Sequence, residues 1–468
     1  MPRSWLIFLL AFVYLFDLGS VGFIGPDEPR YASIGREMAA SHDLITPRLD
    51  GKPWFEKPPL LYWMIAFGRV LRLPDEWAAR LPVALVSLAF LMFFSGTLAR
   101  EFSARVAFAA TAILATSAGW IAYSSVAVTD LPMTAAFWAA MLIAIFDTRR
   151  EQGYIAGGLL GLAILSKAFV PVVLFVPAFL IARRKRVTML VGCILVAAPW
   201  HLLAWARNGA PFWQDYFWKQ QVSRFVSPSL EHVQPVWYYL PVILAGLFPW
   251  TPLVGLLTRR KTYQDVRVRF FVVWLIYALI FFSAARNKLP GYALPLLPAL
   301  AIVVAVALDR AGAQKKWWLA ASALMLVALP AVAAALPDAL LSGLRHAPVH
   351  LTPGIPFLIF AGAAWYLAWR ERTQLAFAAV LAGIAVGLFY VKLRTYSDLD
   401  HRVSVRAFWR DHSSEIPTAC ISDSVRREWR YGLDYYASRE LPECGASASL
   451  EIVESGGKLS LAVPKTLP

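Results

Sequence analysis

The sequence predicts an all-α polytopic membrane protein that ends in a small α/β domain. Of the 468 residues, 59% are apolar and 16% are charged, whereas soluble domains are about 45–50% apolar and about 25% charged. The mean hydropathy is +0.55. At roughly 20 apolar residues per crossing, this composition allows about 13 membrane helices. The same figures exclude a disordered chain, a coiled coil, a collagen-like fibre and a disulfide-rich secreted scaffold.

The apolar runs give the elements in order. Residues 5–23 form the first run, which lacks a small-residue cleavage site and is long for a signal peptide, so we expect a retained helix. No fixed-period repeat is visible. Twelve further runs follow, near residues 77–99, 104–124, 131–147, 153–165, 168–182, 187–206, 237–257, 268–285, 293–308, 317–337, 354–369 and 375–395. The prediction is therefore thirteen helices in a membrane domain spanning residues 1–395.

The basic residues between these runs give the orientation. The net charge of +15 would indicate nucleic acid in a soluble protein, but cytoplasmic loops of membrane proteins collect Lys and Arg. Each basic cluster falls on one side of the membrane if the N-terminus is cytoplasmic. The clusters lie at residues 3, 100–105, 149–150, 183–186, 259–269, 310–316 and 370–372. An odd number of helices then places the C-terminus outside, and we expect no nucleic-acid partner.

The stretch from 152 to 182 tests this topology. It is apolar except for Ser166 and Lys167 in its middle, and both of its flanks are basic. Because both flanks should then be cytoplasmic, we expect a hairpin of two short helices with Lys167 at the outer tip.

Three outer segments are long enough to carry a site. The loop 25–76 contains two helical stretches, near 29–41 and 58–72, which we expect to lie in the interface plane. The second segment spans residues 207–236. The third is the tail 396–468, in which the pattern predicts strands near 419–422, 450–453 and 459–463 and an amphipathic helix near 426–437.

The three cysteines divide by context. Cys193 lies in an apolar run and is expected to be a core residue. Cys420 and Cys444 share the tail, where a disulfide can form if the tail faces an oxidising compartment. With about 70 residues the tail has a marginal core of its own, so we expect it to dock on the membrane domain.

The first outer loop opens with adjacent carboxylates. Asp27 and Glu28 are followed by Arg30 and Tyr31, just beyond the end of a membrane helix. An acid near the low-dielectric interface can act as a general base or stabilise positive charge on a sugar ring. The alternative is that these acids only begin a helix after Pro26.

The same loop ends with a second charged motif. Glu56 and Lys57 stand in the frame Trp54-Phe55-Glu56-Lys57-Pro58-Pro59-Leu60-Leu61-Tyr62. A lysine is a suitable point charge for a phosphate, and the prolines restrict the backbone that presents it. The alternative is a lysine that reaches to the interface above an aromatic belt.

Further polar residues fall on the same predicted side. They are Asp130, Lys167, Arg224, Lys288 and Tyr292. Residues 287–295 also contain Pro and Gly at membrane depth, where irregular backbone is tolerated when it lines a cavity. Each residue alone could be an ordinary loop charge, but ionisable groups close to the membrane usually mark function.

Together the cations and acids indicate a cavity for an anionic amphiphile with acid/base chemistry beside it. A lipid-linked phosphate fits this description best. The sequence contains no HExxH motif, no phosphate-binding P-loop, no GxSxG motif and no cysteine cluster, so zinc hydrolysis, nucleotide chemistry and serine catalysis are unsupported.

The three motifs resemble those of bacterial aminoarabinose transferases, members of the protein-mannosyltransferase-like GT-C superfamily. They are Asp27-Glu28-x-Arg30-Tyr31, Phe55-Glu56-Lys57-Pro58-Pro59-Leu60-x-Tyr62-Trp63 and Lys288-Leu289-Pro290-x-Tyr292-x-Leu294-Pro295. The resemblance implies a GT-C membrane domain of thirteen helices and a periplasmic C-terminal domain. It also implies transfer of a sugar, such as aminoarabinose, from undecaprenyl phosphate to lipid A at the periplasmic face of the inner membrane.

The resemblance also implies roles for individual residues. Asp27, with Glu28 beside it, becomes the catalytic carboxylate, and the donor phosphate is bound by Lys57, Arg224, Lys167 and Lys288. The cavity is shaped by Arg30, Tyr31, Tyr62, Asp130 and Tyr292. Some relatives hold a divalent metal through a Glu and a His. Glu56 matches that Glu, but Gln220 and Gln221 stand near the place expected for the His, so a metal cofactor stays open.

Two alternatives remain open at this point. One keeps the chemistry and changes the acceptor to a protein or another glycan. The other is a transporter of lipid-linked sugars, although transporters usually show internal repeats and a 50-residue outer loop rich in acids and bases is unusual for alternating access.

Overall fold

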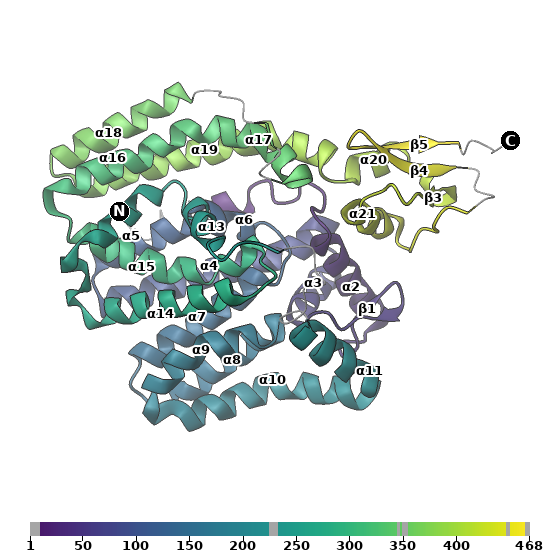
Figure 1. The fold of residues 1–468 in the computed structure, drawn as a ribbon, viewed down its shortest axis with the longest axis horizontal. Coiled ribbons are helices and arrows are strands. Elements are labelled where there is room, and N and C mark those ends of the chain that lie inside the picture. Colours follow the sequence, from purple (N-terminus) through teal and green to yellow (C-terminus); the bar gives the residue numbers. More distant parts are fainter. Residues whose placement is uncertain (1–9, 224–232, 344–346, 349–353, 446–449, 464–468) are drawn as a thin grey trace.

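The computed structural model describes residues 10–223, 233–343, 347–348, 354–445 and 450–463. Helices dominate it, and Figure 1 shows them as a broad helical body, with the three-stranded sheet in the C-terminal part and the short strand β1 beside α2. This mostly helical architecture with several apolar helices confirms the coarse fold prediction.

The elements of the body follow one another along the chain with short connections. From the first loop through the middle of the body they are α2 (Asp27–Ser41), β1 (Arg48–Leu49), β2 (Lys52–Pro53), α3 (Leu60–Val70), α4 (Asp75–Glu101), α5 (Ala104–Ala115), α6 (Ala118–Ser124), α7 (Asp130–Phe146), α8 (Gln152–Lys167), α9 (Val170–Ile181) and α10 (Arg186–Asn208). Then come α11 (Ala210–Phe212), the π-helix η2 (Trp213–Ser223), α13 (Tyr239–Gly246), the 3₁₀-helix η3 (Thr251–Thr258), α14 (Val266–Ala284), α15 (Leu296–Asp309), α16 (Lys315–Met325), α17 (Leu329–Ser342), α18 (Leu358–Trp369) and α19 (Thr373–Arg402).

Every predicted apolar run from 77–99 onward falls on a helix, a bent pair or a broken helix, so the element predictions are confirmed. Within the described residues, five helices are long and apolar enough to cross a membrane, and up to seven if each bent pair counts as one span. The bends lie between α5 and α6 (63°) and between α13 and η3 (115°). The number of crossings stays a prediction.

The predicted break of the stretch 152–182 into two helices is confirmed, while the place of Lys167 at the outer tip stays a prediction. Helices α8 and α9 meet at Ala168, which has a positive φ of 50°. Helix α8 also packs closely on α10, because Gly157 faces the backbone of Met189 so tightly that a Cβ would collide with its carbonyl oxygen. Small residues that let two backbones approach are typical of helix pairs in membranes.

Helices α10 and α14 present large apolar side chains to the outside. On α10, Ile194 and Leu195 are 59% and 67% exposed, and on α14 Val273 and Ile280 are each 64% exposed. In water such a surface would be unfavourable. Lipid chains solvate it at little cost, which agrees with the predicted membrane domain.

Two helix ends differ from the sequence prediction. The first helix gives way to turns from Phe16, rather than continuing to Phe23, and Asp17 has a positive φ of 62°. Helix α19 continues past the predicted boundary at 395 to Arg402. The physical reason for the second difference is that the residues after 395 are held in place: Asp400 accepts a hydrogen bond from the backbone N–H of Gly22 at 2.7 Å and pairs with Arg406 at 2.9 Å.

The tail has the predicted strand and helix order. It comprises α20 (Arg406–Asp411), β3 (Cys420–Ile421), α21 (Arg427–Ala437), β4 (Glu451–Ser455) and β5 (Lys458–Ala462). The sheet order is β3-β4-β5, with β3 and β4 parallel and β4 and β5 antiparallel. The sheet and α21 enclose a small apolar core centred on Ile421, Trp429 and Leu433.

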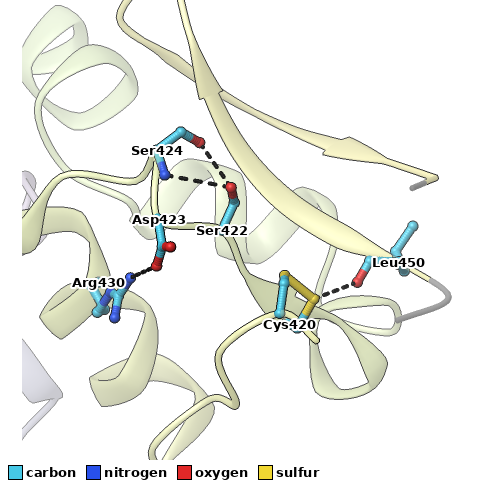
Figure 2. The surroundings of a disulfide bond; sticks show 7 residues. Cys420, Ser422, Asp423, Ser424, Arg430 and Leu450 are labelled. Carbon is cyan, nitrogen blue, oxygen red and sulfur yellow. Dashed lines mark hydrogen bonds and ion pairs between the residues drawn. A yellow bond between two sulfur atoms is a disulfide. The ribbon is translucent and has the colours of Figure 1, made fainter. Parts of the chain in front are cut away.

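A disulfide joins Cys420 of β3 to Cys444, which confirms the bridge that the sequence allowed. Figure 2 shows it beside the sheet, with Asp423 of the following turn directed at Arg430 of α21. Arg430 also pairs with Glu443 at 2.7 Å. The bridge and these ion pairs hold the segment before β4 against α21.

The tail docks on the first outer loop, as expected from its small core. Helix α21 packs on α2, and Figure 1 shows the tail at the same end of the body as α2 and α3. Arg36 of α2 donates to the carbonyl oxygen of Tyr435 at 2.8 Å. Arg406 pairs with Glu76 at 3.2 Å and with Asp400 at 2.9 Å, both within a buried cluster.

Candidate active site

The two adjacent acids at the start of α2 point in different directions. Pro26 begins the helix and places both carboxylates in its first turn, where the helix dipole favours negative charge. The side chain of Asp27 is 43% exposed, whereas that of Glu28 is only 1% exposed. Position 27 therefore faces the solvent-accessible side, and position 28 faces the protein interior.

Glu28 lies in a buried hydrogen-bond network. Its two oxygens accept hydrogen bonds from Nε and Nη2 of Arg80, each at 2.7 Å. They also accept from the backbone N–H groups of Ile24 and Ala127. Arg80 in turn donates to carbonyl oxygens of the segment before α2. Glu28 thus links three chain segments, and the catalytic role expected for it beside Asp27 stays a prediction.

Arg30 connects Asp27 to the second motif. Its guanidinium pairs with the Asp27 carboxylate and, through Nη1, with Glu56 at 2.9 Å. Lys57 lies 3.5 Å from the other oxygen of Glu56, with its side chain 19% exposed. The structure thus brings the two predicted motifs of the first loop together in one charged row, which consists of Asp27, Arg30, Glu56 and Lys57.

Aromatic rings surround Arg30. Its guanidinium carbon lies 5.6 Å from the ring centroids of Tyr31 and Trp54 and 5.3 Å from that of Tyr431. Tyr31 also packs against Tyr62, with 5.7 Å between centroids. Cation–π contacts of this kind gain strength when the cation is desolvated, and the Arg30 side chain is 4% exposed. Tyr431 belongs to α21, so the tail contributes to this site.

The charged row shifts the titration of its neighbours. Burial raises the pKa of Tyr31 well above its usual value, and the carboxylates of Asp27 and Glu56 raise it further. Burial alone would lower the pKa of Arg30, but Glu56 and its other anionic neighbours raise it overall. The phenol therefore stays protonated, and the guanidinium stays charged.

The first residue of α7 and the last residue of α8 form a second charged pair. Lys167, the last residue of α8, pairs with Asp130, the first residue of α7. The ammonium of Lys167 also lies 4.4 Å from the ring centroid of Tyr292. Tyr123 interacts electrostatically with both Asp130 and Asp27, so the second pair lies on the same side as the first row.

The remaining predicted cations are placed differently. Lys288 is 5% exposed, and its ammonium donates to the backbone carbonyl oxygens of Gln234 and Ala285. These bonds connect residues 233–236 to the segment before Pro290, and the phosphate-binding role expected for Lys288 stays a prediction. Arg224 falls outside the described residues.

The surroundings of Glu56 do not fit a divalent metal. Its carboxylate lies between the cations of Arg30 and Lys57, which repel a further cation. Among the described residues, the one group of potential metal ligands comprises Cys420, Cys444 and Glu451, but both cysteines are in the disulfide. We therefore derive no step through a metal.

Two residues that contact the candidate site were not predicted from the sequence, for different reasons. Arg80 lies inside the predicted run 77–99, and an ionisable group within an apolar helix was a usable signal. Tyr431 is 401 positions from Arg30. Nothing local in the sequence connects an amphipathic tail helix to the first loop.

Comparison with known proteins indicates the family of the chain. The family model for dolichyl-phosphate-mannose-protein mannosyltransferases matches residues 56–205. The undecaprenyl phosphate-α-4-amino-4-deoxy-L-arabinose arabinosyl transferase of Pectobacterium carotovorum is 33% identical over 402 residues, which is 80% of this chain and 70% of that protein. The Erwinia tasmaniensis protein of the same name is 32% identical over 81% of this chain and 72% of its own length.

These matches identify the family. The chain belongs to the undecaprenyl phosphate-α-4-amino-4-deoxy-L-arabinose arabinosyl transferases. It spans about 59% of the length of the Serratia proteamaculans relative, to which it is 32% identical. A crystal structure of ArnT from Cupriavidus metallidurans bound to undecaprenyl phosphate superposes with a TM-score of 0.74 at 25% identity, covering 96% of this chain and 87% of that one.

Proposed function

We propose that the protein is an inner-membrane glycosyltransferase that moves a sugar from undecaprenyl phosphate to lipid A on the periplasmic face. The sugar we favour is an amino sugar such as aminoarabinose, in line with the names of the relatives. The observation that carries the proposal is the part-exposed carboxylate of Asp27, which pairs with Arg30, while Glu56 connects Arg30 to Lys57. An acid and cations at one face suit a reaction in which a phosphate leaves an anomeric carbon.

The reaction we propose is one in-line displacement. An acceptor oxygen forms a bond to the anomeric carbon while the bond from that carbon to the phosphate oxygen of the donor breaks. The electron pair of the broken bond goes to undecaprenyl phosphate, which is already a good anionic leaving group and needs cations rather than a proton. Lys57, Lys167 and Arg224 are the cations that we assign to it, because fixed charges stabilise most in a site with little water.

Asp27 has one of two tasks, according to the acceptor. A lipid A phosphate arrives deprotonated and needs positioning, so Asp27 would then stabilise positive charge on the sugar ring. A hydroxyl acceptor would instead give its proton to Asp27. Arg30 holds the carboxylate in place in both cases, and the aromatic frame of Tyr31, Trp54 and Tyr431 holds Arg30. Tyr62, Asp130 and Tyr292 shape the cavity.

The topology belongs to the same proposal. We assign thirteen crossings, a cytoplasmic N-terminus and a periplasmic tail, with the membrane domain at residues 1–395 and the tail domain from 396. The end of α19 at Arg402 favours moving that boundary to residue 402. The disulfide supports a periplasmic tail, since disulfides persist in oxidising compartments.

Mass spectrometry of lipid A tests the function. Cells with the gene should carry lipid A with a pentosamine- or hexosamine-sized addition, and cells lacking the gene or carrying Asp27→Asn should not. Unchanged lipid A in all three strains, with the protein present, would exclude this acceptor. It would leave a protein or another glycan as acceptor, or transport of the lipid-linked sugar.

A further inference from the structure

A cavity lies at the end of the helical body away from the candidate active site. It has a volume of about 280 Å³, and its lining includes Ser95, Arg105, Phe108, Asp309, Lys315 and Phe377. Along α4, Ser95 is 15 residues beyond Arg80, or about 22 Å at 1.5 Å per residue. The cavity therefore belongs to the membrane side where the sequence gathers its basic clusters.

The cavity combines an apolar wall with charges at one end. The rings of Phe108 and Phe377 form part of the wall and pack together, with 5.6 Å between centroids. Arg105 is exposed, and Asp309 and Lys315 are half-buried. No ion pair or hydrogen bond engages these three charged side chains among the residues that the structure describes. The lining contains two cations and one anion and therefore carries a net charge of +1.

The backbone reinforces this positive charge. Helix α5 begins at Ala104, α16 at Lys315 and α19 at Thr373, and all three of these residues line the cavity. The N-termini of α16 and α19 have no side-chain cap. Helix N-termini favour negative charge, so their fields add to those of the two cations.

We propose that this cavity binds one phospholipid of the cytoplasmic leaflet, with a net charge of −1 and a hydroxylated headgroup, as in phosphatidylglycerol. Its phosphate lies between Arg105 and Lys315, and a headgroup hydroxyl donates to the carboxylate of Asp309. Its acyl chains follow the wall at Phe108 and Phe377. The apolar wall selects an amphiphile over free phosphate, and basic pockets between membrane helices on the cytoplasmic side are suited to anionic headgroups.

Native mass spectrometry of the full-length protein in detergent tests the proposal. Phosphatidylglycerol, phosphatidylethanolamine and phosphatidylcholine with identical acyl chains are titrated separately. We expect one phosphatidylglycerol to bind more tightly than either zwitterionic lipid. The double variant R105Q/K315Q should bind it about 30-fold more weakly, as expected for two cations near a membrane surface.

The matched control is R260Q/K316Q, which removes two cations of the same basic side that do not line the cavity. It should bind phosphatidylglycerol as the wild type does, and an equal loss in the control would overturn the site. Equal affinity for all three lipids, or displacement of the lipid by millimolar inorganic phosphate, would also overturn it. K315Q alone serves if the double variant does not fold, with about fivefold weaker binding expected. Sugar transfer is not the readout, so the result is independent of the proposed function.

Discussion

The adjacent acids Asp27 and Glu28 can be separated by one pair of substitutions. Asp27→Asn changes a carboxylate that is 43% exposed and pairs with Arg30. A part-exposed ion pair contributes about 0–1 kcal/mol to stability, so this variant should fold normally. Sugar transfer should fall by about 10²- to 10⁴-fold, which is the usual contribution of a positioned acid or base.

Glu28→Gln should give the opposite pattern. Each Glu28 oxygen accepts two hydrogen bonds, and Arg80 supplies one to each oxygen. A glutamine has only one oxygen that can accept these hydrogen bonds. Its NH₂ group would face two N–H donors, one of them from Arg80, and could accept from neither. Both partners of the pair are at least 97% buried, and breaking a buried pair costs about 3–5 kcal/mol. We expect a melting temperature that is lower by several degrees.

The assay pairs two measurements on each purified variant, thermal unfolding and the initial rate of sugar transfer at a temperature where both variants are folded. At that temperature Glu28→Gln should keep a substantial share of the wild-type rate, because the acid does not face the reacting atoms. A Glu28→Gln protein with wild-type stability and no activity would refute the assignment of Glu28 to positioning. Wild-type activity in Asp27→Asn would refute the assignment of Asp27 to catalysis.

Three further predictions follow from single contacts. Tyr431→Ala should slow transfer about 3- to 30-fold by removing a desolvated cation–π contact to Arg30, and Tyr431→Phe should restore the rate in the same assay. Lys167→Gln should weaken donor binding, measured as a raised KM. If Lys167 binds phosphate and does not only neutralise Asp130, the double variant with Asp130→Asn should show the same raised KM. Burial raises the pKa of Asp434 to about 7, so the folded tail binds this proton more tightly than the unfolded chain does. Stability should therefore fall as the pH rises from about 4 to about 7, and the melting temperature of Asp434→Asn should lack that part of the decrease.

Much of the fold could be predicted because it depends on residues that are close together in the sequence. The hairpin of α8 and α9 follows from one polar pair in an apolar stretch with basic flanks, and α2 and α3 follow from prolines that begin them. The predicted end of α19 at 395 is too early because the polar residues between 396 and 402 suggest a loop. The helix continues because Asp400 and Leu399 contact the segment before α2, which is distant in the sequence.

The sequence predicted that the two motifs of the first loop lie close together, but not the direction of each side chain. Asp27 and Glu28 are equivalent in sequence, and the difference between them comes from Arg80, which is 52 positions beyond Glu28. Lys288 looked like Lys57 in its motif, yet its ammonium is bound to backbone carbonyls. Roles that depend on the direction of a side chain require the packing of distant segments, and local patterns do not contain that information.

The pairing of the site cations has a consequence for how a phosphate would bind. Arg30 is shared between Asp27 and Glu56, so a phosphate on Arg30 would have to compete with two carboxylates. Lys57, by contrast, has a longer contact of 3.5 Å with Glu56 and an ammonium with three donors. Lys57 can thus accept a phosphate while Arg30 continues to orient Asp27. Lys57→Ala should therefore raise the KM for the donor more than Arg30→Lys does. Arg30→Lys should mainly lower kcat, because a lysine lacks the planar guanidinium that bridges the two carboxylates.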